Sequence, residues 1–193
     1  MFKREPNTSN HMSNFKLEQF STNRLNGEMV PADVKVLLVH SDELNERTGI
    51  NLNWEDTWAP WLDTSYLSET DRADPDIAAN VRAIKDVCEH IAFIAIEEDG
   101  QYFGYWRGVN NLPIAECPIV LLDNEGQFRL CSGATFAEAL LEHRTFKRRG
   151  ELRDWMRSIG VSLPNGEVNG LLSPNVAHSP DKLHQDLYVR YRG

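Results

Sequence analysis

The chain has few cysteines and no long hydrophobic run. Its 193 residues include three cysteines, Cys88, Cys117 and Cys131, which are widely spaced and form no CxxC pair. Buried free thiols in a reducing compartment are the best explanation of an odd, scattered set. The longest apolar stretches, such as 91–96, are far shorter than the roughly 20 residues that cross a bilayer. We therefore expect no disulfide framework, no membrane segment and a cytoplasmic protein.

The motifs of the common catalytic centres are absent as well. The sequence contains no GxSxG, HExxH, P-loop or GxGxxG motif. One tight group of possible metal ligands falls in a stretch rich in proline and asparagine, and comprises His178, Asp181 and His184. His40, beside Asp42 and Glu43, is interpreted as part of a charged helix end. We expect no enzyme, no catalytic residue, no metal site and no cofactor, and a hydrolase that uses His40 or His178 is the weakest alternative.

Basic charge is scarce. Twenty Lys and Arg residues stand against 29 Asp and Glu residues, which gives a formal net charge of −9 and disfavours direct nucleic-acid binding. The deficit is concentrated between residues 42 and 100, where fifteen acids and four bases give a local charge of −11. Such a region favours a partner with a basic surface. A solvated acidic face that serves solubility is the open alternative.

Local signals predict three helix starts. Pro31 suits the first turn of a helix whose following apolar residues share one face. Asp74 can cap a second helix, with Pro75 at its first position. Thr135 and Glu138 have the spacing of a capping box before a third helix.

Four apolar segments separated by turn residues predict strands at 91–96, 101–106, 118–122 and 127–131. Asp99-Gly100 marks the first turn between them. Because the segments follow one another closely, an antiparallel meander is the economical arrangement. We expect an α+β fold, with a mainly antiparallel sheet of about four to six strands flanked by helices.

Three tryptophans, Trp54, Trp58 and Trp61, lie within the acidic stretch 51–63. Their spacing of four and then three would place them on one face of a helix. Three large aromatics in so short a window form either a satellite core or a recognition surface.

The two ends of the chain are interpreted as appendages of one domain. Residues 1–25 are polar, with no apolar segment following the first basic residues, and are expected to be a flexible leader. The domain proper is assigned to residues 26–145. Residues 146–193 are expected to contain a short helix over 151–159, stopped by Gly160, and then an irregular tail packed on the same domain.

Three segments of the sequence resemble segments of a known protein family. The run 94–106 (IAIEEDGQYFGYW) resembles the central hairpin of the SUKH superfamily, in which a strand ending in an acidic-Gly turn precedes a strand with glycine and aromatics. The run 118–128 (PIVLLDNEGQF) looks like the next hairpin of the family, and 135–141 (TFAEALL) looks like its closing helix. The resemblance covers about residues 76–142, and it departs from the family pattern at 40–45, where no glycine turn follows the first helix.

The resemblance implies an α+β fold and a non-catalytic, protein-binding role. It implies a bacterial immunity protein that neutralises a cognate toxin, such as a nuclease with a basic cleft, by direct binding. An intracellular regulatory or scaffold module of the same family, without a toxin, is the alternative. We expect a monomer or weak homodimer. The partner-binding residues expected from charge and aromatic content are Glu55, Asp56, Trp58, Trp61, Glu97, Glu98, Asp99, Tyr102, Tyr105 and Trp106.

Overall fold

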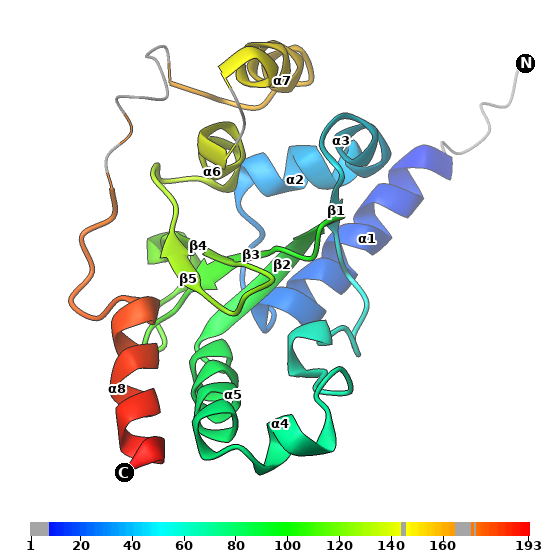
Figure 1. Ribbon diagram of the computed structural model, residues 1–193. Helices are drawn as coiled ribbons and strands as arrows, with labels where there is room; N and C mark the ends of the chain where they lie inside the picture. Colours follow the sequence, from blue (N-terminus) through cyan, green and yellow to red (C-terminus); the bar gives the residue numbers. More distant parts are fainter. Residues whose placement is uncertain (1–7, 144–145, 165–170, 172) are drawn as a thin grey trace, which may run out of the picture.

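A computed structural model describes residues 8–143, 146–164, 171 and 173–193 of the chain (Figure 1). The helices are α1 (Thr8–Leu25), α2 (Ala32–Val39), α3 (Ser41–Thr48), α4 (Glu69–Ala73), α5 (Pro75–Cys88), α6 (Phe136–His143), α7 (Phe146–Ser158) and α8 (Pro180–Arg192), with short 3-10 turns η1 (Pro60–Leu62) and η2 (Ile114–Glu116). The strands are β1 (Ile50–Leu52), β2 (Ile91–Glu97), β3 (Tyr102–Trp106), β4 (Ile119–Leu122) and β5 (Phe128–Leu130).

The five strands form one antiparallel sheet in the order β1-β2-β3-β4-β5. Each strand therefore pairs with its neighbour in the sequence. The short turn-rich connections predict this order for β2 to β5, whereas β1, which is separated from β2 by η1, α4 and α5, was not predicted. The predicted α+β fold, an antiparallel sheet flanked by helices, is confirmed.

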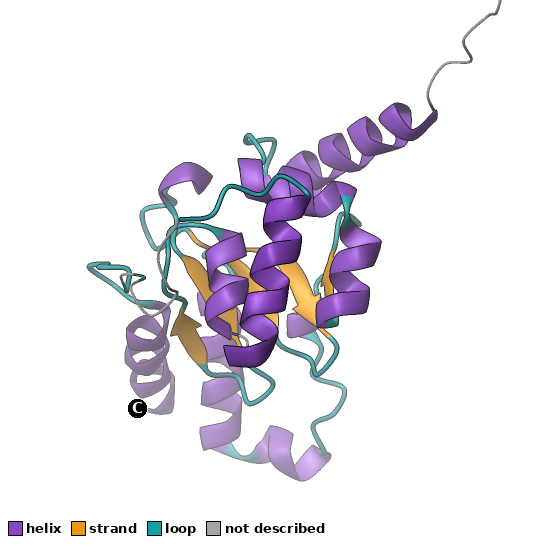
Figure 2. Ribbon diagram, turned by 90° about the horizontal axis from the view of Figure 1, so that it is seen from above, coloured by secondary structure: helices purple, strands orange, loops and turns teal. Residues whose placement is uncertain are grey.

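Helices cover the sheet on both faces (Figure 1). Figure 2 looks down on the helices that lie across one of these faces. Along β4, Ile119 and Leu121 enter the core beneath α2 and α6, whereas Val120 and Leu122 enter a second core beneath α5 and α8. Because both faces are buried, the strand is apolar at every position instead of alternating with polar residues.

The helix predicted at Pro31 begins at Ala32 without a side-chain cap, and the other two predicted helix starts are confirmed by capping hydrogen bonds. The Asp74 carboxylate accepts the backbone N–H groups of Asp76 and Ile77 at 2.8 and 3.2 Å. The Thr135 hydroxyl accepts the N–H of Glu138 at 3.2 Å, and the Glu138 carboxylate accepts the N–H of Thr135 at 3.1 Å. These reciprocal bonds satisfy N–H groups that a helix start leaves without internal partners.

A β-bulge in β2 depends on a glycine in β3. Phe93 pairs with Gly104 and Ala95 pairs with Phe103, so Ile94 is the extra residue. Ile94 and Ala95 consequently both enter the core beneath α2 and α6. A Cβ atom at Gly104 would lie 2.5 Å from Cγ2 of Ile91 and 2.9 Å from a backbone carbonyl oxygen. Only glycine fits where the bulged strand approaches this closely.

The expectation of a flexible leader over 1–25 was wrong for the part that the structure describes. Residues 8–25 form helix α1, and the side chains of Phe20 and Leu25 are completely buried in the core beneath α2. Residues 1–7 of the expected leader lie outside the described residues. Burying two large apolar side chains supplies the free energy that holds α1 in place despite its polar composition.

The C-terminal segment was predicted in part. The expected helix over 151–159 lies within α7, with Trp155 and Met156 buried. The expectation of an irregular tail was wrong for residues 180–192, which form α8 against α5. Leu187 of α8 enters the second core, and the indole N–H of Trp106 donates to the His178 carbonyl at 3.0 Å just before this helix. Residues 165–170 and 172 of the tail lie outside the described residues.

The three cysteines are free and buried. Burial raises the pKa of Cys88 and of Cys131 to about 12, and that of Cys117 to about 11. Because the thiolate is the nucleophile, we expect Ellman's reagent at pH 8 to leave the native protein almost unmodified over minutes. All three thiols should react at once in guanidinium chloride. A thiol that reacts rapidly in the folded protein would contradict this burial.

Candidate interaction surface

The segment 53–68, which we term the tryptophan loop, is not the predicted helix. Its only regular element is the turn η1. The guanidinium of Arg24, at the end of α1, donates to three backbone carbonyls of the loop: Glu55 at 2.5 Å, Asp56 at 3.1 Å and Trp58 at 2.9 Å. The loop's carbonyl groups therefore bind a side chain instead of forming helical hydrogen bonds, which explains why the spacing of the tryptophans misled.

The tryptophan loop places aromatic rings over the sheet. Trp58 and Trp61 meet edge to face with ring centroids 5.2 Å apart. Trp61 lies 4.2 Å from Phe93 of β2, and both tryptophans contact Tyr102 of β3 at 6.2 and 5.9 Å. Three of the predicted partner-binding residues are thus brought together, and all three keep part of their surface exposed.

Two apolar residues of the tryptophan loop that were not predicted are more exposed. Leu62 is 46% exposed and Tyr66 is 74% exposed. Exposed carboxylates surround these side chains in the sequence, from Glu55 and Asp56 to Asp63. The signal for Leu62 and Tyr66 was their place in the same acidic, aromatic run, whereas helical periodicity directed attention to the tryptophans alone.

Three predicted partner-binding residues are buried, and their assignment to a binding surface was wrong. Glu97 is 7% exposed and bonds His143 of α6 at 2.8 Å. Tyr105 is 3% exposed and Trp106 is 1% exposed, because helices cover β3 on both faces. Glu97 and Trp106 therefore face the interior, and Tyr105 borders open space only at the groove described below.

Glu98 and Asp99 are exposed, as predicted, but they lie at the turn between β2 and β3. The backbone N–H of Glu98 donates to the Gly49 carbonyl at the end of α3 at 3.0 Å. Asp99 accepts from the Gln101 amide at 2.9 Å. The residues of this hairpin whose rings meet the tryptophans are Phe93 and Tyr102.

Part of the acidic excess between residues 42 and 100 serves structure. Hydrogen bonds from Ser65 lower the pKa of Asp63, and hydrogen bonds from Ser68 at the start of α4 lower the pKa of Asp71. Asp76 pairs with Arg192 of α8 at 2.7 Å. The local charge of −11 is therefore divided among helix caps, ion pairs and free carboxylates, and the tryptophan loop holds only some of it.

A separate groove of about 770 Å³ opens on the other side of the sheet. Its walls come from residues 28–36, β3, the region of η2, the start of α6 and the residues that follow α7. Asp33 of α2 lies in it, 8% exposed, and its Oδ2 accepts the N–H of Ala137 at 3.0 Å. Tyr105 also lines the groove, and burial, followed by the nearby Asp33 charge, raises its pKa well above the usual value.

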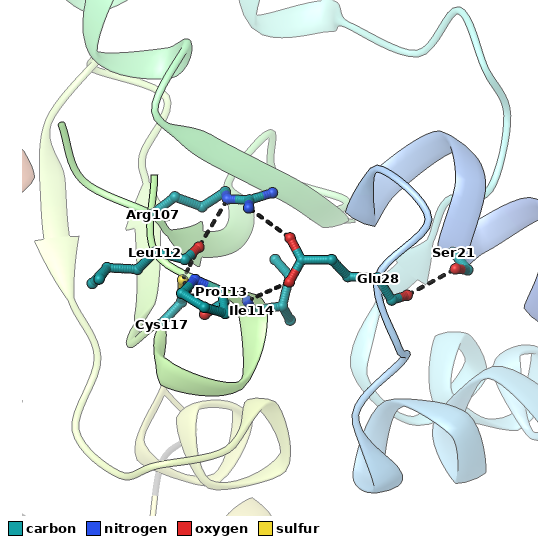
Figure 3. A network of polar contacts seen from close by, with 7 residues as sticks. All are labelled: Ser21, Glu28, Arg107, Leu112, Pro113, Ile114 and Cys117. Atoms are coloured by element: carbon teal, nitrogen blue, oxygen red, sulfur yellow. Dashed lines mark hydrogen bonds and ion pairs between the residues drawn. The ribbon is translucent and has the colours of Figure 1, made fainter. Parts of the chain in front are cut away.

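One wall of this groove is held by the polar network in Figure 3. The Glu28 carboxylate accepts from the Arg107 guanidinium at 2.5 Å and from the Ile114 N–H at 2.9 Å. Arg107 also donates to the Leu112 carbonyl at 3.0 Å, and the Cys117 thiol donates to the carbonyl of Pro113 at 3.2 Å. These bonds connect the segment after α1 with the loop after β3 and fix the shape of the wall.

The residues that the structure describes contain no group of three His, Cys, Asp or Glu side chains placed to hold a metal ion. His184 instead meets Asn80 at 2.9 Å, and burial lowers its pKa. His40 meets Glu43 at 3.3 Å at the start of α3. Within the described ranges, none of the helices combines the length and apolar character needed to cross a bilayer.

Comparison with known proteins adds no assignment: no family model, no curated protein and no solved structure matches the chain. Its function has to be inferred from the surface and the groove themselves.

Proposed function

We propose that the protein is a non-catalytic binding module whose tryptophan loop contacts a protein partner. The observation that carries this proposal is the gathering of Trp58, Trp61 and Tyr102 by a loop that also carries the exposed side chains of Leu62 and Tyr66. Aromatic residues dominate the binding energy of protein interfaces, especially when a polar rim surrounds them. Exposed Glu55 and Asp56 supply such a rim.

The partner we propose is a basic toxin domain such as a nuclease, which makes the chain a cytoplasmic bacterial immunity protein of the SUKH type. The resemblance of 94–106, 118–128 and 135–141 to that superfamily and the acidic rim of the loop support this proposal. Negative charge around an aromatic centre accelerates encounter with a basic cleft and makes binding sensitive to salt. A regulatory module without a toxin remains the second proposal.

The decisive experiment compares four baits in host lysate and secretome, at low and moderate salt. The wild type and a Val39→Ala control should recover the same partner, because Val39 is 52% exposed on α2, which packs into the core on the opposite face of the sheet. Tyr66→Ala should weaken binding by about thirtyfold or more, the size of an aromatic hot spot. Tyr66 is 74% exposed, so the fold should not change.

Glu55→Gln with Asp56→Asn should reduce the salt dependence, since these side chains are exposed and the hydrogen bonds from Arg24 go to their backbone carbonyls, which both substitutions keep. The purified partner is then assayed for nuclease or other toxic activity with and without the chain. Inhibition by the wild type supports the immunity role, whereas an inactive partner favours the regulatory module. Equal recovery by Tyr66→Ala, or no partner at all, removes the tryptophan loop from the proposal.

A further inference from the structure

The groove contains a buried hydroxyl group that the protein leaves without a partner. Tyr105 is 3% exposed, and its hydroxyl makes no hydrogen bond to any described residue. Buried polar groups in folded proteins are nearly always hydrogen-bonded, and each exception calls for a physical explanation. A ligand group that reaches the hydroxyl is one such explanation.

A carboxylate near this hydroxyl is also incompletely satisfied. Asp33 is 8% exposed, and the one hydrogen bond described for it runs from the N–H of Ala137 to its Oδ2. No Lys, Arg or His of the described chain forms an ion pair with it. A carboxylate removed from water is unfavourable unless hydrogen bonds or a cation compensate it, and here one helix N–H supplies all the described compensation.

The remaining walls are suited to an apolar body. Val30, Pro31 and Ile114 line the groove together with Met29, which is 78% exposed. Its volume of about 770 Å³ lies inside the range of small-molecule sites. The groove shares no lining residue with the tryptophan loop. Ligand binding in the groove can therefore be tested separately from partner binding at the loop.

We propose that the groove binds an organic cation, a primary ammonium or guanidinium group carried on an apolar body. The cationic group donates to the free oxygen of Asp33 and to the phenolic oxygen of Tyr105, and the body lies along the apolar wall. The same chemistry is presented by a free amine and by a lysine or arginine side chain of a protein. Lys35, which is exposed at the groove, opposes a cation and sets the direction of one test below.

The first experiment titrates n-hexylamine, 1-hexanol and hexanoate into the full chain at constant ionic strength, followed by amide NMR shifts. The three probes share one apolar chain and differ in charge. Hexylammonium should bind saturably and shift the amides of residues 32–35 and 134–137. Hexanol should bind about tenfold more weakly or worse, because its neutral hydroxyl can donate to the Asp33 carboxylate but forms no ion pair with it, and hexanoate should not bind.

A further arm separates the two sources of the cation. N-acetyl-lysine N-methylamide carries the same ammonium group with the flanking peptide bonds of a protein chain. If it binds as tightly as hexylamine or tighter, the groove takes a basic side chain of a partner. If it binds more weakly, the groove takes a free amine.

Three substitutions test the assigned contacts. Asp33→Asn keeps an oxygen for the Ala137 N–H and removes the charge, so the affinity for hexylamine should fall about tenfold or more. Tyr105→Phe removes the unpartnered hydroxyl, so the protein should be as stable as the wild type or more stable while affinity falls roughly threefold to tenfold. Lys35→Gln removes a like charge and should tighten binding by about two- to fivefold.

Lys182→Gln on α8 is the matched control, because Lys182 is exposed, pairs with Asp186, and belongs to a helix on the opposite face of the sheet from α2 and α6 (Figure 1). It should leave the affinity unchanged. Equal binding of hexanol and hexylamine, unchanged affinity in a folded Asp33→Asn variant, or no binding of any probe would overturn the proposal. None of these outcomes bears on the partner of the tryptophan loop.

Discussion

Replacing Phe20 with alanine is expected to lower the free energy of unfolding by about 3–5 kcal/mol, as for other buried phenylalanines. Phe20 is completely buried in the core shared by α1, α2 and β2, so truncation leaves a cavity next to the sheet. The loss would be a large share of the roughly 5–15 kcal/mol that stabilises an ordinary domain. Urea denaturation followed by tryptophan fluorescence measures it.

Phe15→Ala is the matched control on the same helix. Phe15 is 60% exposed, so its removal should change the free energy of unfolding by no more than about 0.5 kcal/mol. If both substitutions had the same small effect, residues 8–25 would be a leader after all. The outcome also concerns the tryptophan loop, because α1 carries Arg24, whose three bonds to loop carbonyls hold the aromatic cluster.

The parts of the fold that were predicted correctly are determined by residues that lie close together in the sequence. Asp74-Pro75 and the Thr135–Glu138 box are complete within four residues, and the hairpins are set by turns between adjacent apolar runs. Helix α1 lacks such a signal: most of its residues are polar, and its position depends on tertiary burial of a few apolar side chains. A short local window therefore predicts the sheet but not the helix packed on it.

Overlooking α8 explains a further error about the binding residues. Ser179-Pro180-Asp181 has the form of a helix start, yet the preceding proline- and asparagine-rich residues favoured an irregular tail. Trp106 was assigned to the binding surface from charge and aromatic content, with no helix predicted over 180–192 to cover it. In the structure, Trp106 lies in the same core as Leu187 and donates to His178. An error about one helix thus became an error about a site on a distant strand.

The sequence predicted that tryptophan rings of this segment meet, but it did so from an incorrect helical geometry. The rings of Trp58 and Trp61 do meet, although the segment is not helical and the contact depends on Arg24 and on the floor formed by Phe93 and Tyr102. The groove could not be predicted at all. Asp33 and Tyr105 are 72 positions apart in the sequence, and neither belongs to a motif that indicates their proximity.

Replacing Gly104 with alanine is expected to disturb both sites through one added methyl group. The new Cβ would lie 2.5 Å from a methyl carbon of Ile91 and 2.9 Å from the backbone oxygen of Ala92. Because a backbone oxygen in a paired strand cannot rotate away, β2 and β3 have to separate. We expect the free energy of unfolding to fall by about 1–3 kcal/mol, the usual range for overpacking.

The matched control is Gly150→Ala in α7, where an added Cβ meets no atom within 4 Å. Alanine in a helix interior should raise the free energy of unfolding by about 0.5–1 kcal/mol, so the same chemical change should act in opposite directions at the two positions. Gly104 lies between Phe103 and Tyr105 and opposite Phe93. Its substitution should therefore also shift the tryptophan emission of the loop and weaken hexylamine binding in the groove, whereas Gly150→Ala should alter neither. Equal stability of the two variants would mean that the bulge in β2 does not require glycine, and that the two sites are positioned independently of it.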